Sequence, residues 1–123
     1  MKKSLVSVMI AVLAIFVVAG AAWSSLRYYD TDQLEEGNFY TMTLRLQKGG
    51  SYMAVAAASQ GKVDFDLTAI DPDGNEVVTS DLTDDNTDWI RFTADKEGNY
   101  KIKITAYKGS GWYELMVLDV DHY

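Results

Sequence analysis

Hydrophobic and polar residues alternate one by one along residues 89–107, and this alternation constrains the fold more than any other feature. On either side of a Lys-Glu-Gly-Asn turn, apolar residues occupy every second position, at Ile90, Phe92, Tyr100, Ile102 and Ile104. A period of two is typical of antiparallel strands with one face in a core and the other in water. Because two strands are not stable alone, the rest of the chain must supply strands that cover the apolar face.

Further segments of strand length, separated by Gly-rich or Asp-rich turns, fill the chain from Phe39 onward. The expected strands are 39–46, 52–58, 63–69, 76–80, 89–94, 100–107 and 112–120. The segment Tyr52 to Ala58 is apolar on both faces, which predicts a central strand that is covered on each side or is approached by a partner. About seven to eight strands with regular turns predict an all-β fold, an antiparallel β-sandwich.

The N-terminal part of the chain has a different composition. No charged residue lies between Lys3 and Arg27, so 23 residues form an uncharged run. As a helix this run would measure roughly 34 Å, against about 30 Å of membrane hydrocarbon. We predict a single transmembrane helix in 1–26, a juxtamembrane connector in 27–38 and an extracytoplasmic sandwich in 39–123. Lysines ahead of the run place the N-terminus in the cytoplasm of a single-pass cell-membrane protein.

Cleavage of the leader is the alternative. Ala19-Gly20-Ala21 and Gly20-Ala21-Ala22 are small-residue sequences of the kind that follows a signal peptide. Processing near Ala21 or Ala22 would release a secreted domain. The length of the apolar run, and Trp23 at the outer interface with two tyrosines beyond it, favour a retained anchor.

Charge and cysteine content exclude several classes of partner and site. The formal net charge of -7 disfavours nucleic acid as a partner. The chain has no cysteine, which excludes disulfides, thiolate metal sites and a cysteine nucleophile.

Catalytic and metal-binding patterns are weak. The single histidine, His122, lies beside the C-terminus, and nothing marks a nucleophile with its base. We therefore predict a protein that is not an enzyme and has no cofactor. Asp84, Asp85 and Asp88 form the densest acidic cluster and provide the oxygen ligands that calcium prefers. Calcium binding there is a hypothesis, and a solvated loop tip is the favoured interpretation.

Large aromatic residues provide a further signal. If Ile90 and Tyr113 face inward, several aromatic side chains fall on opposite faces or at strand ends, where they often mark contact surfaces. The predicted partner-contact residues are Trp23, Trp89, Tyr107 and Trp112. Packing within the sandwich is the alternative interpretation of these aromatic residues.

Four segments together show a family pattern. They are FDLTAIDPDGN at 65–75, IRFTA at 90–94, GNYKI at 98–102 and GWYEL at 111–115. Over roughly 37–120 the chain resembles the bacterial and archaeal pre-peptidase C-terminal domain. The resemblance implies a jelly-roll-like sandwich, usually an accessory module of secreted enzymes, sometimes calcium-stabilised or able to bind matrix polymers. Here no protease precedes the module, which instead follows the apolar run.

These patterns lead to three functional hypotheses. The first is a non-catalytic accessory or assembly subunit of an envelope membrane complex, which contacts integral membrane proteins through its helix and its exterior domain. The helix offers small residues that allow neighbouring helices to approach closely. The alternative is a secreted module that binds polysaccharide or matrix protein. A weaker alternative is a pilin-like filament subunit.

Overall fold

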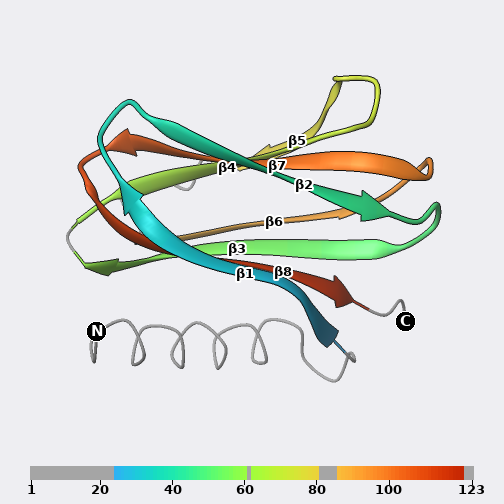
Figure 1. Ribbon diagram of the computed structural model, residues 1–123, viewed down its shortest axis with the longest axis horizontal. Coiled ribbons are helices and arrows are strands. Elements are labelled where there is room, and N and C mark those ends of the chain that lie inside the picture. Colours follow the sequence, from blue (N-terminus) through green and yellow to red (C-terminus); the bar gives the residue numbers. More distant parts are fainter. Residues whose placement is uncertain (1–23, 61, 81–85, 121–123) are drawn as a thin grey trace.

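The computed structural model describes residues 24–60, 62–80 and 86–120, which form two antiparallel sheets stacked face to face (Figure 1). The strands are β1 Ser24–Leu34, β2 Phe39–Leu46, β3 Ser51–Gln60, β4 Asp64–Ile70, β5 Glu76–Ser80, β6 Thr87–Thr93, β7 Gly98–Lys108 and β8 Gly111–Val120. The predicted β-sandwich is confirmed. Seven of the eight strands in the described residues correspond to the seven expected segments, and β1 is the one that was not expected.

Strand order defines the type of sandwich. One sheet has the order β1-β8-β3-β6 and the other the order β2-β7-β4-β5. Every consecutive pair of strands crosses from one sheet to the other, except β4 and β5, which form a hairpin within one sheet. This arrangement is that of an eight-stranded jelly roll.

The core lies between the two sheets and consists of the residues that alternate inward. The five apolar residues predicted from the alternation in 89–107 are all buried there. Aromatic rings from both sheets interlock: Phe92 of β6 stacks on Tyr100 of β7 with ring centroids 6.0 Å apart, and Tyr40 of β2 stacks on Tyr113 of β8 at 6.2 Å. These contacts join the two layers directly.

The predicted connector is wrong for 27–34. These residues belong to β1, which pairs with β8 along its whole length, so the sandwich begins at Ser24 rather than at residue 39. A bulge at Arg27 shifts the register and breaks the alternation, while Asp30, Thr31 and Asp32 give the strand a polar composition. An edge strand tolerates this composition because one of its sides faces solvent.

Residues 1–23, which include Trp23 and most of the predicted transmembrane helix, lie outside the described residues. Membrane insertion therefore stays a prediction. Residues 24–26 of the predicted transmembrane helix are strand. The described ranges contain no helix with the length and hydropathy of a membrane span.

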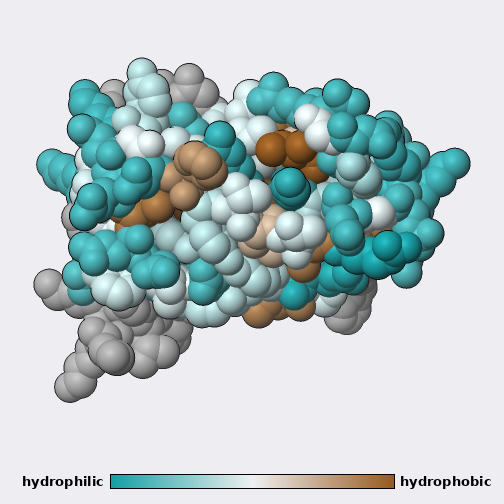
Figure 2. All heavy atoms as spheres, turned by 45° about the horizontal axis from the view of Figure 1, so that its top comes forward, coloured by the Kyte–Doolittle hydropathy of each residue, from teal (hydrophilic) through white to brown (hydrophobic). Residues whose placement is uncertain are grey.

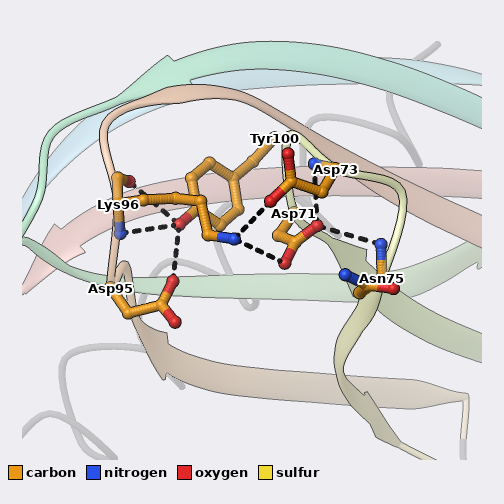
Figure 3. A network of polar contacts seen from close by, with 6 residues as sticks. All are labelled: Asp71, Asp73, Asn75, Asp95, Lys96 and Tyr100. Carbon is orange, nitrogen blue, oxygen red and sulfur yellow. Dashed lines mark hydrogen bonds and ion pairs between the residues drawn. The ribbon is translucent and has the colours of Figure 1, made fainter.

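A polar network joins two turns at one end of the sandwich (Figure 3). The Asp71 carboxylate accepts hydrogen bonds from the backbone N–H groups of Asp73 and Asn75, each at 2.9 Å. Lys96, in the β6–β7 turn, reaches across with its Nζ 2.6 Å from Asp73 Oδ2 and 3.4 Å from Asp71 Oδ2. Tyr100 donates from its hydroxyl to the Lys96 carbonyl at 3.0 Å. The network therefore ties the β4–β5 turn to the β6–β7 turn.

Candidate binding surface

The outer face of the β1-β8-β3-β6 sheet is apolar along its two central strands. On β3 and β8 the residues between the inward positions are as hydrophobic as the inward ones. We call the outward set the apolar strip: Met53, Val55, Ala57, Met116, Leu118 and Val120. An antiparallel sheet with one solvated face normally carries polar residues at such positions.

Strand register makes the strip continuous. Met53 lies opposite Leu118, and Val55 lies opposite Met116, on adjacent hydrogen-bonded strands. All six side chains of the strip are buried, yet none of the eight described strands lies over them, since the second sheet packs on the opposite face. The strip therefore has the character of a covered surface.

Aromatic and charged side chains border the strip. Tyr29 of β1 lies opposite Met116, and Trp89 of β6 lies opposite Val55. Both rings are exposed. Arg91, also exposed, follows on the same outward side of β6. An apolar centre with an aromatic and charged margin is the usual composition of a protein interface.

One carboxylate lies on this apolar face. Glu114 of β8 is fully buried, and its Oε2 accepts a hydrogen bond from the Tyr29 hydroxyl. Its other oxygen, Oε1, has no hydrogen-bond partner. Burial first, and then the bond to Glu114, raise the pKa of Tyr29 above its ordinary value, so the phenol remains a donor at neutral pH. A buried oxygen without a donor is costly for folding.

The outer face of the β2-β7-β4-β5 sheet is polar. Its outward residues on β2 and β7 pair as Thr41 with Lys103 and Thr43 with Lys101. Figure 2, in which the top of Figure 1 comes forward, shows hydrophilic residues toward both ends, residues of intermediate hydropathy between them, and separate hydrophobic patches. Lys103 also extends over the exposed Phe39 ring, with its Nζ 4.4 Å from the ring centroid. The composition of this face is that of a solvated sheet surface.

The predicted contact residues divide between the two faces. Ile90, Ile102 and Tyr113 are buried as expected, which turns the three described aromatic residues outward. Their exposed fractions are 41% for Trp89, 37% for Trp112 and 64% for Tyr107. Trp89 and Trp112 share the face of the apolar strip, whereas Tyr107 lies on the polar-faced sheet. Their role as contacts stays a prediction.

The three aspartates predicted to bind calcium are not all placed. Asp84 and Asp85 lie outside the described residues. Asp88 is in strand β6 instead of the expected acidic loop, and its side chain is fully buried. No group of three His, Cys, Asp or Glu side chains within 24–60, 62–80 and 86–120 is arranged to hold a metal ion. The calcium hypothesis remains untested.

Asp88 has hydrogen bonds on one oxygen only. Its Oδ1 accepts from the Ser80 hydroxyl at 2.5 Å and from the Trp89 backbone N–H at 3.0 Å. Its Oδ2 has no hydrogen-bond partner. Burial raises the pKa of Asp88 above its ordinary value of 3.8, and the charge of Asp64 raises it further. Asp88 is therefore a buried carboxylate that costs free energy when it ionises.

A polar cleft of about 520 Å³ opens at the end of the sandwich that carries the β7–β8 turn. Its lining comes from several loops and strand ends and consists of Glu36, Lys62, Val63, Asp64, Asn86, Lys108 and Gly109. Glu36 is oriented by the Gly109 backbone N–H, which donates to its Oε1 at 2.7 Å. The sequence did not point to this cleft, because its residues come from separate segments.

No family model matches the sequence, and no curated protein matches it. Solved structures do match. The pre-peptidase C-terminal domain of a Bacillus anthracis collagenase is 20% identical, with a TM-score of 0.62 over 75% of this chain and 89% of that domain.

Two further solved structures are similar in fold. The Yersinia pseudotuberculosis-derived mitogen is 15% identical, with a TM-score of 0.59 over 82% of this chain and 87% of its own length. Aeromonas hydrophila PliG, a periplasmic inhibitor of g-type lysozyme, is 12% identical, with a TM-score of 0.56 over 82% and 89%. At identities this low the likeness concerns the fold alone. The predicted resemblance to the pre-peptidase C-terminal domain is confirmed as a β-sandwich of that fold.

Proposed function

We propose that this chain is a non-catalytic accessory subunit that binds a protein partner through the outer face of the β1-β8-β3-β6 sheet. The uncharged N-terminal run holds it at an envelope membrane, and the sandwich lies outside the cytoplasm. In this position the apolar strip meets the exterior surface of a neighbouring membrane protein.

The apolar strip is the observation that carries this proposal. Closing the two sheets on each other requires apolar residues between them, whereas Met116 and Leu118 are apolar residues on the outer side of one sheet. Water would be an unfavourable neighbour for such a surface. Trp89 and Arg91 at the margin belong to the residue types that are enriched at protein interfaces.

Site-specific photo-crosslinking in native membranes tests the proposal. A photoreactive amino acid replaces Leu118 in the strip, and in a matched control it replaces Lys101 on the polar outer face. We expect an adduct of discrete mass, containing a second protein, from position 118 and none from position 101.

Three results would contradict the proposal. They are no adduct at either position, equal adducts at both positions, and a crosslink from position 118 that stays within the chain. The last result would mean that the strip is covered by the chain itself. Circular dichroism of both variants checks that the β-sandwich has formed.

The polar cleft favours a second candidate function, a secreted module that binds polysaccharide. Lys62, Asn86 and Glu36 offer donors and acceptors of the kind that sugar hydroxyls need. N-terminal sequencing of the mature protein separates the two candidates, because a start at Ala22 or Trp23 supports export. A glycan array then tests the cleft, and loss of binding in Asn86→Ala would support the polysaccharide function.

A further inference from the structure

We propose that the polar cleft binds an acidic sugar of a polysaccharide, with the sugar carboxylate held by Lys62 and Lys108. This inference rests on the second candidate function, polysaccharide binding, and specifies the charge of the ligand. It does not depend on the apolar strip. It follows from the backbone contact that brings the two lysines together, from the orientation of Glu36 and Asn86, and from the exposed ring of Tyr107 beside the cleft.

A close backbone contact brings the two lysines to the same cleft. At Gly109, which has a φ of +82°, a Cβ atom would lie 2.2 Å from the Lys62 carbonyl oxygen, so only glycine allows this approach. Lys108 immediately precedes Gly109, and both lysines are exposed residues of the cleft lining. None of the ion pairs within 24–60, 62–80 and 86–120 involves either lysine. Two ammonium groups in one cleft attract an anion.

The two carboxylates of the lining limit how much negative charge the ligand can carry. Glu36 is held at both ends: its Oε1 accepts from the Gly109 N–H at 2.7 Å, and its own N–H donates to the Ser110 hydroxyl at 2.8 Å. Asp64 is buried at the start of β4. A ligand with several adjacent carboxylates would be repelled by these two acids. A uronic acid unit has one carboxylate for the lysines, and its hydroxyl groups can donate to Glu36.

Asn86 adds a fixed amide to the lining. Its Oδ1 accepts a hydrogen bond from the Val63 backbone N–H at 3.2 Å, and its backbone carbonyl accepts from the Ala58 N–H at 2.7 Å. Because the amide oxygen bonds to a backbone donor, Nδ2 is the part of the amide that can donate to a ligand. The cleft therefore presents donors and acceptors for the hydroxyl groups of a sugar as well as cations for its carboxylate.

Tyr107 offers an apolar surface beside the cleft. It is the extra residue of a bulge in β7, between Ala106, which pairs with Phe65, and Lys108, which pairs with Asp64. A bulge re-aims a side chain out of the regular alternation, and Tyr107 is the most exposed of the large apolar and aromatic side chains in the described residues. An aromatic ring can cover the apolar C–H face of a sugar ring. Tyr107 should therefore contribute affinity that does not depend on the charge of the sugar.

The net charge of the chain opposes the binding of an anion. The formal net charge is -7, so a polyanion is repelled at long range. At about 0.15 M ionic strength the Debye length is about 8 Å, and exposed charges farther away than this are largely screened. The lysines that contact the sugar carboxylate then dominate the interaction, and binding is best measured at this ionic strength.

The experiment uses the full chain in a nonionic detergent. The probes are trisaccharides of galacturonate, mannuronate and glucuronate, each as the free acid and as the methyl ester, which removes the charge and keeps the ring. Isothermal titration calorimetry measures the affinities. We expect at least one acid to bind about tenfold more tightly than its own ester, as charge-assisted hydrogen bonds predict.

Four variants assign the effect. Lys62→Gln and Lys108→Gln should each reduce the preference for the acid, and the double variant should remove it. Tyr107→Ala should weaken the acid and the ester alike and keep the preference. Lys101→Gln is the matched control, because this exposed lysine lies roughly 24 Å from Lys108 along β7 and its loss changes the net charge equally. It should leave both affinities unchanged.

The contradicting results are distinct. If the esters bind as tightly as the acids, or the double lysine variant keeps the preference, the inference is wrong while the polysaccharide function stands. The same holds if no trisaccharide binds but the glycan array finds a neutral glycan that requires Asn86. If a peptide of glutamates binds as tightly as the best acid, the cleft selects an anion rather than a sugar, and the inference is wrong. If neither experiment detects a glycan, the inference and the polysaccharide function are both wrong.

Discussion

The outer faces of the two sheets differ, although the same core holds both sheets. On the β2-β7-β4-β5 sheet, the outward residues of β7 include Lys101, Lys103 and Thr105, and they alternate with buried isoleucines. On the β1-β8-β3-β6 sheet, strands β3 and β8 are apolar on both sides. One sheet is therefore built for water on its outer side, and the other is built for contact on both sides.

This difference separates the residues that close the sandwich from those on the proposed contact face. A sandwich needs one apolar face on each sheet, and the polar-faced sheet has no more than that. The second apolar face goes beyond what closing the two sheets on each other requires, and it is the face to which we assign the proposed contact. Substitutions on the two faces should therefore have different consequences, and the predictions below test this in order of decreasing effect.

The largest expected effect lies in the shared core next to the polar face. Ile104 of β7 is fully buried between the sheets, and Ile104→Ala should lower the free energy of unfolding by about 3 kcal/mol. The next residue faces outward, and Thr105→Ala should change it by about 0.5 kcal/mol or less. Urea denaturation of both variants measures the contrast. Similar losses for the two would mean that the polar face is also packed.

On β8, an inward and an outward neighbour should lose similar amounts of stability when each is replaced by alanine. Leu115 faces inward and Met116 faces outward, yet both are buried. In the full chain Met116→Ala should cost about 2 kcal/mol, close to the cost of Leu115→Ala. The same denaturation experiment in mild detergent measures both. If Met116→Ala is neutral while Leu115→Ala is costly, the strip is exposed to solvent and the comparison between the two faces fails.

The sequence revealed most of the polar-faced sheet and less of the other one. Alternation identified the strands on both sides of the β6–β7 turn and their inward residues, because one solvated face imposes a period of two. It did not show that β6 and β7 lie in different sheets. Strand β1 was missed, because its bulge at Arg27 interrupts the alternation and its pairing partner, β8, lies at the opposite end of the described chain. Pairing between such distant segments has no local signal.

The candidate binding surface was visible in the sequence only in part. The apolar character of YMAVAAA in β3 pointed to a strand covered on both sides. The equally continuous run ELMVLDV in β8 was assigned only an inward set, although it carries the same signal. Counting back by two from Ile90 also puts Asp88 inward, against the acidic-loop interpretation. Glu114 next to Tyr29 had no signal, because it depends on the register between β1 and β8.

One buried or partly buried aspartate on each sheet should make the stability depend on pH, and the two dependences should have opposite signs. The first aspartate is Asp88, in β6 of the apolar-faced sheet. Because burial raises its pKa, its ionisation lowers stability as the pH rises above 3.8 through the folded-state value. Asp88→Asn keeps an acceptor for Ser80 and removes the charge, so it should gain about 1 kcal/mol at neutral pH. Urea midpoints at pH 4 and pH 7 measure this. The gain should shrink at pH 4, and a gain that is independent of pH would contradict the assignment.

The second aspartate is Asp71, in the β4–β5 turn of the polar-faced sheet. Its substitution should have the smallest effect on stability of those predicted here. Hydrogen bonds from the Asn75 and Asp73 backbone and the nearby Lys96 ammonium lower its pKa below 3.8. Its carboxylate therefore stabilises the fold above that pH, and the contribution is lost as the pH falls through the folded-state value. Asp71→Asn should lower the urea midpoint slightly at pH 7 and not at pH 2. Lys96→Gln should reproduce part of this loss, because it removes the cation and leaves the turn. If acid instead widens the difference between wild type and Asp71→Asn, the turn-to-turn network does not stabilise this sheet through charge.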